Sequence, residues 1–278
     1  MRLAPRLLVA PFLWFSFFVL VPLIIVMIVS LAQRGPYGII QWTFGVQNYL
    51  NAFNLRYSGI LIESLKLASV TSLICLVLGV LIAWAMATAN AGLRSFYVMA
   101  LALPFLTNLI IRIYAIRLFV GVDGPLQVML TQLGVDFDPY SFTQNKVLVL
   151  YGMVTTYLPF MVFPLYGAFE KFDFNLVEAA QDLGANSAQV FFKVLLPNLK
   201  AAMGTGLILV FVPALGEYVI PDLLGGAKNM LLGNLITEQF LKSRDWPMGS
   251  ALSVILMSIL LLFSALVFLL RKRTKYGS

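Results

Sequence analysis

The chain has 278 residues, of which 60% are hydrophobic and 11% are charged, and its formal net charge is +7. About a quarter of the residues of a soluble domain are charged, so this composition excludes a chain that is surrounded by water over most of its surface. The absence of histidine and the single cysteine, Cys75, exclude histidine-based catalysis, an intrachain disulfide and a thiolate metal cluster. The basic residues lie in short clusters between apolar runs, which is typical of membrane topology and predicts contact with lipid and not with nucleic acid.

The first predicted element is a long apolar run at residues 7–31, preceded by Arg2 and Arg6. A cleaved signal peptide has a shorter apolar core and ends at a site of small residues. Because this run is long enough to cross a bilayer and no such site follows it, we interpret it as a retained first span.

Six apolar runs reach the length of about 20 residues that a membrane-spanning helix needs. They lie near residues 8–31, 60–89, 95–120, 146–169, 203–224 and 248–270. The sequence therefore predicts an all-α membrane protein with six transmembrane helices. Since no linker or internal repeat divides the chain, we expect a single domain over residues 1–278, with one long loop at about 170–202.

The distribution of basic residues predicts the orientation. With the N-terminus inside, ten basic residues fall in inner segments and six in outer segments, and this excess predicts that both termini are cytoplasmic. The inner ones are Arg2, Arg6, Arg94, Lys171, Lys193, Lys200, Arg271, Lys272, Arg273 and Lys275, and the outer ones are Arg34, Arg56, Lys146, Lys228, Lys242 and Arg244.

The loop before the fifth run has the pattern of two short helices that meet at a glycine. Asn175 is placed to cap the first helix, with Glu178 reaching back to the cap amide. Ala179 and Ala180 favour helix, and Gly184 can end it in the left-handed conformation.

The second helix of the loop is predicted to begin with another capping pair, Asn186 and Gln189. Its residues include apolar side chains that suit a bilayer surface or a neighbouring helix, and Pro197 is expected to end it. On local physics alone, an ordinary amphipathic connector accounts for this loop.

The spacing of seven residues adds a more specific indication. Glu178-Ala179-Ala180, Gly184 and Val194-x-Leu196-Pro197 match the pattern E-A-A-x3-G-x9-I-x-L-P, with one methyl group fewer at Val194. In this motif the chain resembles the permease subunits of importers driven by ATP-binding-cassette proteins.

This resemblance implies a type I importer permease with the MetI-like architecture. It implies that the matching residues form a coupling helix that docks into a separate ATP-binding subunit, with Glu178, Ala179, Ala180 and Gly184 at the contact and Val194, Leu196 and Pro197 completing the motif. The chain lacks the G-x-x-x-x-G-K-[ST] loop of an ATPase. We therefore expect a transport subunit that is not an enzyme and binds no cofactor itself, whereas a partner subunit uses ATP and Mg²⁺.

Ionisable residues inside the predicted spans are the other candidates for function, because such groups usually face protein or a water-filled cavity. They are Glu63, Lys66, Arg112, Arg117, Glu217 and Asp222. In one interpretation they pair and hold the helices together, which Glu63 and Lys66 favour because they lie one helical turn apart. In the other, some of them line a cavity for substrate. For Arg112 and Arg117, a third interpretation is that their heads extend to the membrane interface.

The fifth predicted span is interrupted around an acidic residue. Pro213, Gly216 and Pro221 surround Glu217, and proline removes a backbone hydrogen bond and opens a helix. Interrupted spans beside polar residues often mark transport pathways, although a kink needed only for packing has the same appearance.

Further stretches are similar to the spermidine/putrescine permease family. They are residues 103–114, 158–166, 225–229 and 244–247. This resemblance implies two ATP-binding subunits, a second and related permease subunit, an outer substrate-binding protein, and a location in a bacterial inner membrane. Recognition of a long polycation needs carboxylates and aromatic faces, for which we predict Glu217, Tyr218, Asp222, Tyr114 and Asp123.

Three alternatives remain open. Arg112 and Arg117 oppose a cation, and relatives in the same broad group transport thiamine, phosphonate, iron or sulfate. A stand-alone channel or secondary transporter would need no coupling loop. An intramembrane enzyme would need a nucleophile and base or a metal site, for which the sequence gives no convincing set of residues.

Overall fold

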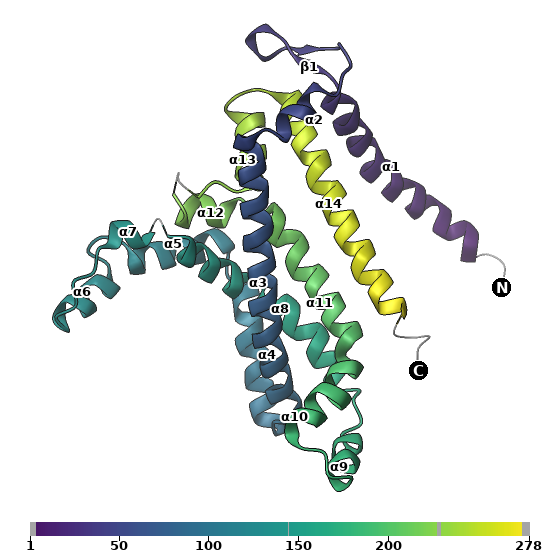
Figure 1. The fold of residues 1–278 in the computed structure, drawn as a ribbon, viewed down its shortest axis with the longest axis vertical. Helices are drawn as coiled ribbons and strands as arrows, with labels where there is room; N and C mark the ends of the chain where they lie inside the picture. The colour runs from purple at the N-terminus through teal and green to yellow at the C-terminus, as the bar shows by residue number, and fades with distance from the viewer. Residues whose placement is uncertain (1–3, 144, 227–228, 274–278) are drawn as a thin grey trace. The chain divides into compact units, whose positions relative to one another are not determined.

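The computed structural model describes residues 4–143, 145–226 and 229–273, and within them the chain is almost entirely helical (Figure 1). Among the described residues, five helices are long and apolar enough to cross a membrane, and there are six spans if two helices joined by a 90° bend are counted as one. The five are Pro11–Ser30, Tyr57–Thr88, Lys146–Phe169, Ser187–Gly216 and Trp246–Leu270, and the bent pair is Ala91–Pro104 with Leu109–Gln132. The predicted all-α membrane architecture is confirmed.

Three of the basic residues that entered the orientation prediction, Arg2, Lys228 and Lys275, lie outside the described residues. The chain divides into two compact units. The first unit consists of residues 1–62 and 232–259, and the second consists of residues 63–231 and 260–278. Each unit is described by itself.

The first unit contains α1 and several short elements between the long helices. Its elements are α1 (Ala4–Ser30), β1 (Gln33–Arg34), η1 (Pro36–Gly38), β2 (Ile40–Gln41), α2 (Gln47–Ala52), the first residues of α3 (Leu55–Thr88), α13 (Leu232–Leu241) and the first half of α14 (Trp246–Arg273). Buried Asn48 donates its side-chain amide to the carbonyls of Ser30 and Ala32, at 2.9 Å and 2.7 Å. The last carbonyls of a helix lack partners within it, so this contact stabilises the end of α1.

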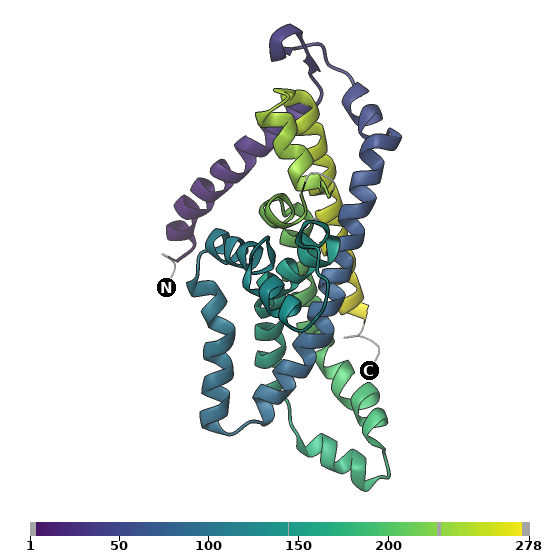
Figure 2. The same ribbon diagram turned by 90° about the vertical axis from the view of Figure 1, so that its left-hand side faces the viewer.

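The second unit contains the remaining helices. They are the rest of α3, α4 (Ala91–Leu106), α5 (Leu109–Val120), α6 (Pro125–Gln132), α7 (Pro139–Thr143), α8 (Lys146–Phe169), α9 (Asn175–Asp182), α10 (Ser187–Val190), the π-helical turn η2 (Phe191–Leu195), α11 (Leu196–Gly216), α12 (Val219–Leu224) and the second half of α14. The chain runs along α8, through α9 and α10, and back along α11, so α9 and α12 lie at opposite ends of this helix pair (Figures 1 and 2).

In the second unit, the side chain of Met161 on α8 packs against two glycines, one on α3 and one on α11. Met161 of α8 is fully buried, and a Cβ atom at Gly79 of α3 would lie 2.6 Å from its Cγ. A Cβ atom at Gly206 of α11 would overlap the Met161 sulfur. Because only glycine leaves room for this side chain, α3 and α11 can both approach α8 closely.

Two of the predicted spans are broken helices. The run predicted at 95–120 is divided into α4, which ends at Leu106, and α5, which begins at Leu109, since Asn108 accepts the amide of Ile110 at 2.8 Å and caps a new helix. The run predicted at 203–224 ends as a helix at Gly216, and α12 begins at Val219. The prediction for 95–120 was right about apolar length and wrong about continuity, whereas the second break lies at Glu217, where the sequence predicts an interrupted span.

Candidate functional site

The 175–197 segment, which carries the seven-residue motif, begins with a short helix that ends as predicted. Gly184 has a φ angle of +86°, in the left-handed region. Its amide donates to the Gln181 carbonyl at 2.8 Å, and the Ala185 amide donates to the Ala180 carbonyl at 3.0 Å. These two bonds form a Schellman motif, in which a left-handed residue closes the last turn of a helix.

The second half of the segment also starts as predicted. Asn186 accepts the Gln189 amide at 2.9 Å, and the Gln189 side chain accepts the Asn186 amide at 3.0 Å, which is a complete capping box. The α10 helix that follows continues through η2 into α11, so Ser187–Gly216 is one helical run.

Two details of the sequence interpretation are wrong. Asn175 is the first residue of α9 and not its cap, because the carboxylate of Asp173 accepts the Asn175 amide at 3.0 Å. Pro197 does not end the second helix. A proline interferes with the carbonyl four residues before it, and the wider π-helical turn at Phe191–Leu195 allows the helix to continue past Pro197.

The motif residues of α9 are presented on an accessible surface. Glu178, Ala179 and Gly184 are exposed, and Ala180 is half-buried. Sequence reasoning missed two neighbours, Leu176 and Leu183, which are 48% and 90% exposed. Exposed leucines beside an exposed alanine on an amphipathic helix indicate a surface for a protein partner, because water solvates such a patch poorly.

The later motif positions are less accessible. Val194 and Leu196 are half-buried, whereas Pro197 is exposed. The Val194 carbonyl accepts the side-chain amide of Asn198 at 2.7 Å. These residues therefore stabilise the junction between the segment and α11.

The capping box allows a first test. We expect Asn186→Ala to cost about 1 kcal/mol of local helix stability, since it removes a cap acceptor, and Asn186→Asp to retain most of it. Hydrogen exchange at the amides of residues 187–190 measures this change. Equal protection in the alanine variant and the unaltered protein would contradict the role of the cap.

The C-terminal end of α8, just before the 175–197 segment, is stabilised by a cluster of three side chains that the sequence did not predict. Glu170 accepts the Tyr166 hydroxyl at 2.6 Å, and the Arg94 guanidinium lies 3.6 Å from the same carboxylate. Arg94 also lies over the Tyr166 ring, 5.8 Å from its centroid. All three are near water, so each pair contributes only up to about 1 kcal/mol, but together they tie the start of α4 to the end of α8.

A cleft lined by both polar and apolar residues lies at the other end of the helix pair. Its volume is about 520 Å³, and α5, α7 and α12 contribute to its walls. The lining residues are Tyr114, Arg117, Leu118, Gly121, Val122, Tyr140, Asp222, Leu223 and Gly226. Two predicted pathway residues, Tyr114 and Asp222, thus line the same cleft. Arg117 lines it as well.

The other predicted pathway residues are placed differently. Asp123 lies exposed in the turn between α5 and α6, with a φ angle of +56°, and Tyr218 is half exposed at the break before α12. Neither lines the cleft. Their contact with substrate stays a prediction.

Glu217 is buried at the break between α11 and α12, with 9% of its surface exposed. One carboxylate oxygen accepts the hydroxyl of Tyr157 on α8. The other accepts the amides of Val219 and Ile220, at 2.8 Å and 3.3 Å, and so caps the first turn of α12. These contacts give Glu217 a structural role, and its predicted contact with substrate stays a prediction.

Arg112 forms two hydrogen bonds within the second unit. Its guanidinium donates to the hydroxyl of Thr156 on α8 at 3.1 Å and to the carbonyl of Pro104 at 3.0 Å. Pro104 lies in the last turn of α4, so Arg112 holds both sides of the break between α4 and α5.

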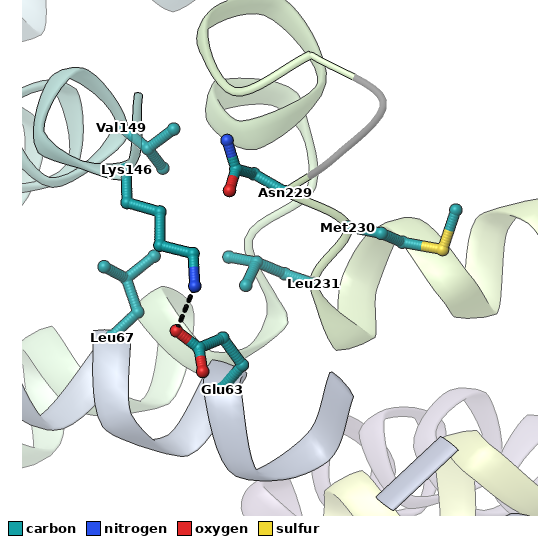
Figure 3. Close-up of a pocket in the computed structure, with 7 residues that line it drawn as sticks. All are labelled: Glu63, Leu67, Lys146, Val149, Asn229, Met230 and Leu231. Atoms are coloured by element: carbon teal, nitrogen blue, oxygen red, sulfur yellow. Dashed lines mark hydrogen bonds and ion pairs between the residues drawn. The ribbon is translucent and has the colours of Figure 1, made fainter. Parts of the chain in front are cut away.

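The partner of Glu63 differs from the predicted one. Glu63 pairs with Lys146 at the start of α8, with Nζ 2.5 Å from the carboxylate, and not with Lys66 one turn away (Figure 3). The ion pair borders a cavity of only about 50 Å³, which Asn229 and Leu231 also line. Such a cavity has room for water and not for a polyamine, so this pair joins α3 to α8.

Comparisons with known proteins give the family. Residues 75–276 match the family described as "Binding-protein-dependent transport system inner membrane component". The spermidine/putrescine transport system permease protein PotB of Haemophilus influenzae is 39% identical over 264 residues, which cover 95% of this chain and 91% of the relative.

Solved structures give the fold. A bacterial ABC transporter involved in the import of the acidic polysaccharide alginate has a chain with a TM-score of 0.78 at 16% identity, and the match covers 98% of this chain and 95% of that chain. A second structure, in complex with an alginate pentasaccharide-bound periplasmic protein, has a TM-score of 0.76 at 16% identity and coverage of 99% and 96%. At this identity the likeness shows the fold alone.

The family match covers most of the chain, and the apolar helices agree with it. The chain therefore belongs to the inner-membrane components of binding-protein-dependent transport systems, as a multi-pass permease subunit of an ABC importer.

Proposed function

We propose that this permease transports polyamines such as spermidine and putrescine. The observation that carries the proposal is the 39% identity, over 95% of the chain, to a spermidine/putrescine permease. The chemistry of the cleft supports it, since Asp222 supplies a carboxylate and Tyr114 and Tyr140 supply aromatic faces, which together attract ammonium groups.

The proposed assembly contains two ATP-binding subunits, a second and related permease subunit, and an outer substrate-binding protein. In this assembly the 175–197 segment docks on an ATP-binding subunit in the cytoplasm, and both termini are cytoplasmic. The exposed Leu176, Ala179 and Leu183 support the docking, because a partner that covers them removes apolar surface from water.

The mechanism is alternating access. ATP and Mg²⁺ are bound by the partner subunits, and closure of these subunits moves the 175–197 segment. Because α8 enters this segment and α11 leaves it, the helix pair carries the movement towards the cleft, which opens to receive substrate from the binding protein.

One observation favours a different substrate for the same architecture. Arg117 lines the cleft, and its guanidinium suits an anion such as sulfate or a phosphonate better than a polycation. The test must therefore compare charges of both signs.

The assembled transporter in proteoliposomes provides this test. We expect ATP hydrolysis to rise when the binding protein is loaded with spermidine or putrescine, and not when binding proteins loaded with thiamine, sulfate or phosphonate are supplied. We also expect Asp222→Asn to raise the KM for polyamine uptake about tenfold, or about 1.4 kcal/mol, because a cation loses a charged partner.

Asp136→Asn is the matched control, since Asp136 is an exposed acid that does not line the cleft. It should leave the KM unchanged. Stimulation by an anion-loaded binding protein, with none by polyamine, would overturn the proposed substrate.

A further inference from the structure

The two walls of the cleft are formed by short helices that each follow a break. Tyr114 and Arg117 come from α5, which follows the break after α4. Asp222 and Leu223 come from α12, which follows the break after α11. Because neither wall continues from a long helix, other contacts must fix its position.

The α12 wall is fixed through Glu217. Its carboxylate bridges the Tyr157 hydroxyl of α8 to the amides of Val219 and Ile220 in the first turn of α12. Both Tyr157 and Glu217 are buried, at 6% and 9% exposure, so water does not readily replace these hydrogen bonds.

The α5 wall is fixed by Thr156, the residue that precedes Tyr157 on α8. Thr156 accepts a hydrogen bond from Arg112, whose other nitrogen donates to Pro104 of α4. Successive residues of a helix point about 100° apart, which is why neighbouring side chains on α8 reach different helices.

Packing around Gly152, earlier on α8, brings the two walls of the cleft to the same point of this helix. A Cβ atom at Gly152 would lie 2.9 Å from Ile220 and from Leu224 of α12, and 3.7 Å from Ile113 of α5. Gly152 lies about one turn before the two polar residues. The stretch from Gly152 to Tyr157 therefore supports both walls of the cleft.

We propose that Thr156 and Tyr157 are positioning residues that couple the cleft walls to α8, and that Glu217 anchors one wall instead of binding substrate. This inference rests on the proposed function in one respect, namely that substrate passes through the cleft. The other end of α8 enters the 175–197 segment, so a movement of that segment reaches both walls through two adjacent side chains.

The first experiment measures the position of α12 without any substrate. The reporter is Leu223→Cys in a Cys75→Ser background, because Leu223 lines the cleft and Cys75 is the only native cysteine. In the full transporter we expect Tyr157→Phe and Glu217→Ala each to change the rate of maleimide labelling at position 223 about tenfold, which corresponds to about 1.4 kcal/mol. The double variant should resemble Glu217→Ala, since both substitutions break the same contact.

The α5 wall has an equivalent reporter. In the same background, Leu118→Cys places a thiol among the cleft-lining residues of α5. Thr156→Val removes the acceptor for Arg112 with little change in shape, and we expect it to change the labelling rate at position 118 about tenfold. The reporter at position 223 should respond less, because Glu217 still holds α12.

The helix itself offers matched controls. Thr155→Val removes a hydroxyl that donates to the carbonyls of Tyr151 and Gly152 within α8, and Tyr151→Phe changes a side chain that is 55% exposed. Neither should alter labelling at either reporter. The amount of assembled transporter in the membrane identifies variants that fail to fold.

Polyamine uptake then separates anchoring from substrate binding. Glu217→Gln keeps an oxygen that accepts the α12 amides and gains an amide that can donate to the Tyr157 hydroxyl, so we expect near-normal uptake. Tyr157→Phe, in contrast, should lower the maximal rate of uptake more than it raises the KM. A raised KM in Glu217→Gln with normal uptake in Tyr157→Phe would assign Glu217 to substrate and overturn the inference. Unchanged labelling in Tyr157→Phe and Glu217→Ala would also overturn it, whatever substrate the transporter takes.

Discussion

Gly184→Pro is expected to leave the protein in the membrane and to abolish the stimulation of ATP hydrolysis by the loaded binding protein. Proline requires a φ angle near −65°, whereas Gly184 has +86° and its amide donates to Gln181. The substitution must therefore open the turn between α9 and α10. ATPase activity of the reconstituted complex, with and without the loaded binding protein, measures the loss of coupling.

A graded series at the same position identifies the cause. Asn tolerates the left-handed conformation, whereas Ala there costs about 1 kcal/mol, so coupling should fall from Gly184→Asn to Gly184→Ala and then to Gly184→Pro. Gly134→Ala is the control, because Gly134 also has a positive φ angle and also has no other group within 4 Å of its Cβ position, but lies between α6 and α7. Equal coupling in Gly184→Pro and the unaltered protein would exclude a role for this turn.

Glu178→Lys should also abolish the stimulation of ATP hydrolysis by the loaded binding protein, but for another reason. Glu178 is exposed in the first turn of α9, where an acidic residue favours the helix by about 0.3–1 kcal/mol. This effect is too small to unfold the segment. Loss of coupling with normal membrane levels would therefore indicate a lost contact with the ATP-binding subunit.

Gly152→Val is expected to destabilise the second unit. Its Cβ atom would lie 2.9 Å from Ile220 and Leu224, which are both fully buried, so the side chains have no free space to move into. We expect a cost of about 1–3 kcal/mol and a displaced α12. Thermal unfolding of the purified complex and uptake by proteoliposomes measure the two consequences.

The control lies on the same helix. Gly167→Ala adds a Cβ atom that meets no other group within 4 Å, and Ala favours a helix over Gly by about 1 kcal/mol, so this variant should be as stable as the unaltered protein or more stable. Gly152→Val combined with Leu224→Ala should recover part of the loss, since the smaller side chain makes room. A normal unfolding temperature for Gly152→Val alone would show that α12 does not pack closely on α8.

The sequence by itself determined the membrane class, the positions of the long apolar helices and the turn chemistry of the 175–197 segment. These features depend on local properties, namely hydropathy, the left-handed conformation of Gly184 and the capping pair Asn186 and Gln189. The seven-residue spacing also indicates the family, because the motif lies within one continuous stretch of chain.

Only the tertiary structure decided that the third predicted span breaks, that the helix continues past Pro197, and which polar groups meet. Pro104 lies in the last turn of α4, which ends before the Asn108 cap, whereas the helix continues past Pro197 through a π-helical turn. Glu63 pairs with Lys146, which is 83 residues away, and Glu217 meets Tyr157, which is 60 residues away. No periodicity along the chain encodes such pairs, because they depend on how α3, α8 and α11 pack, and this packing assigns each buried polar group its partner.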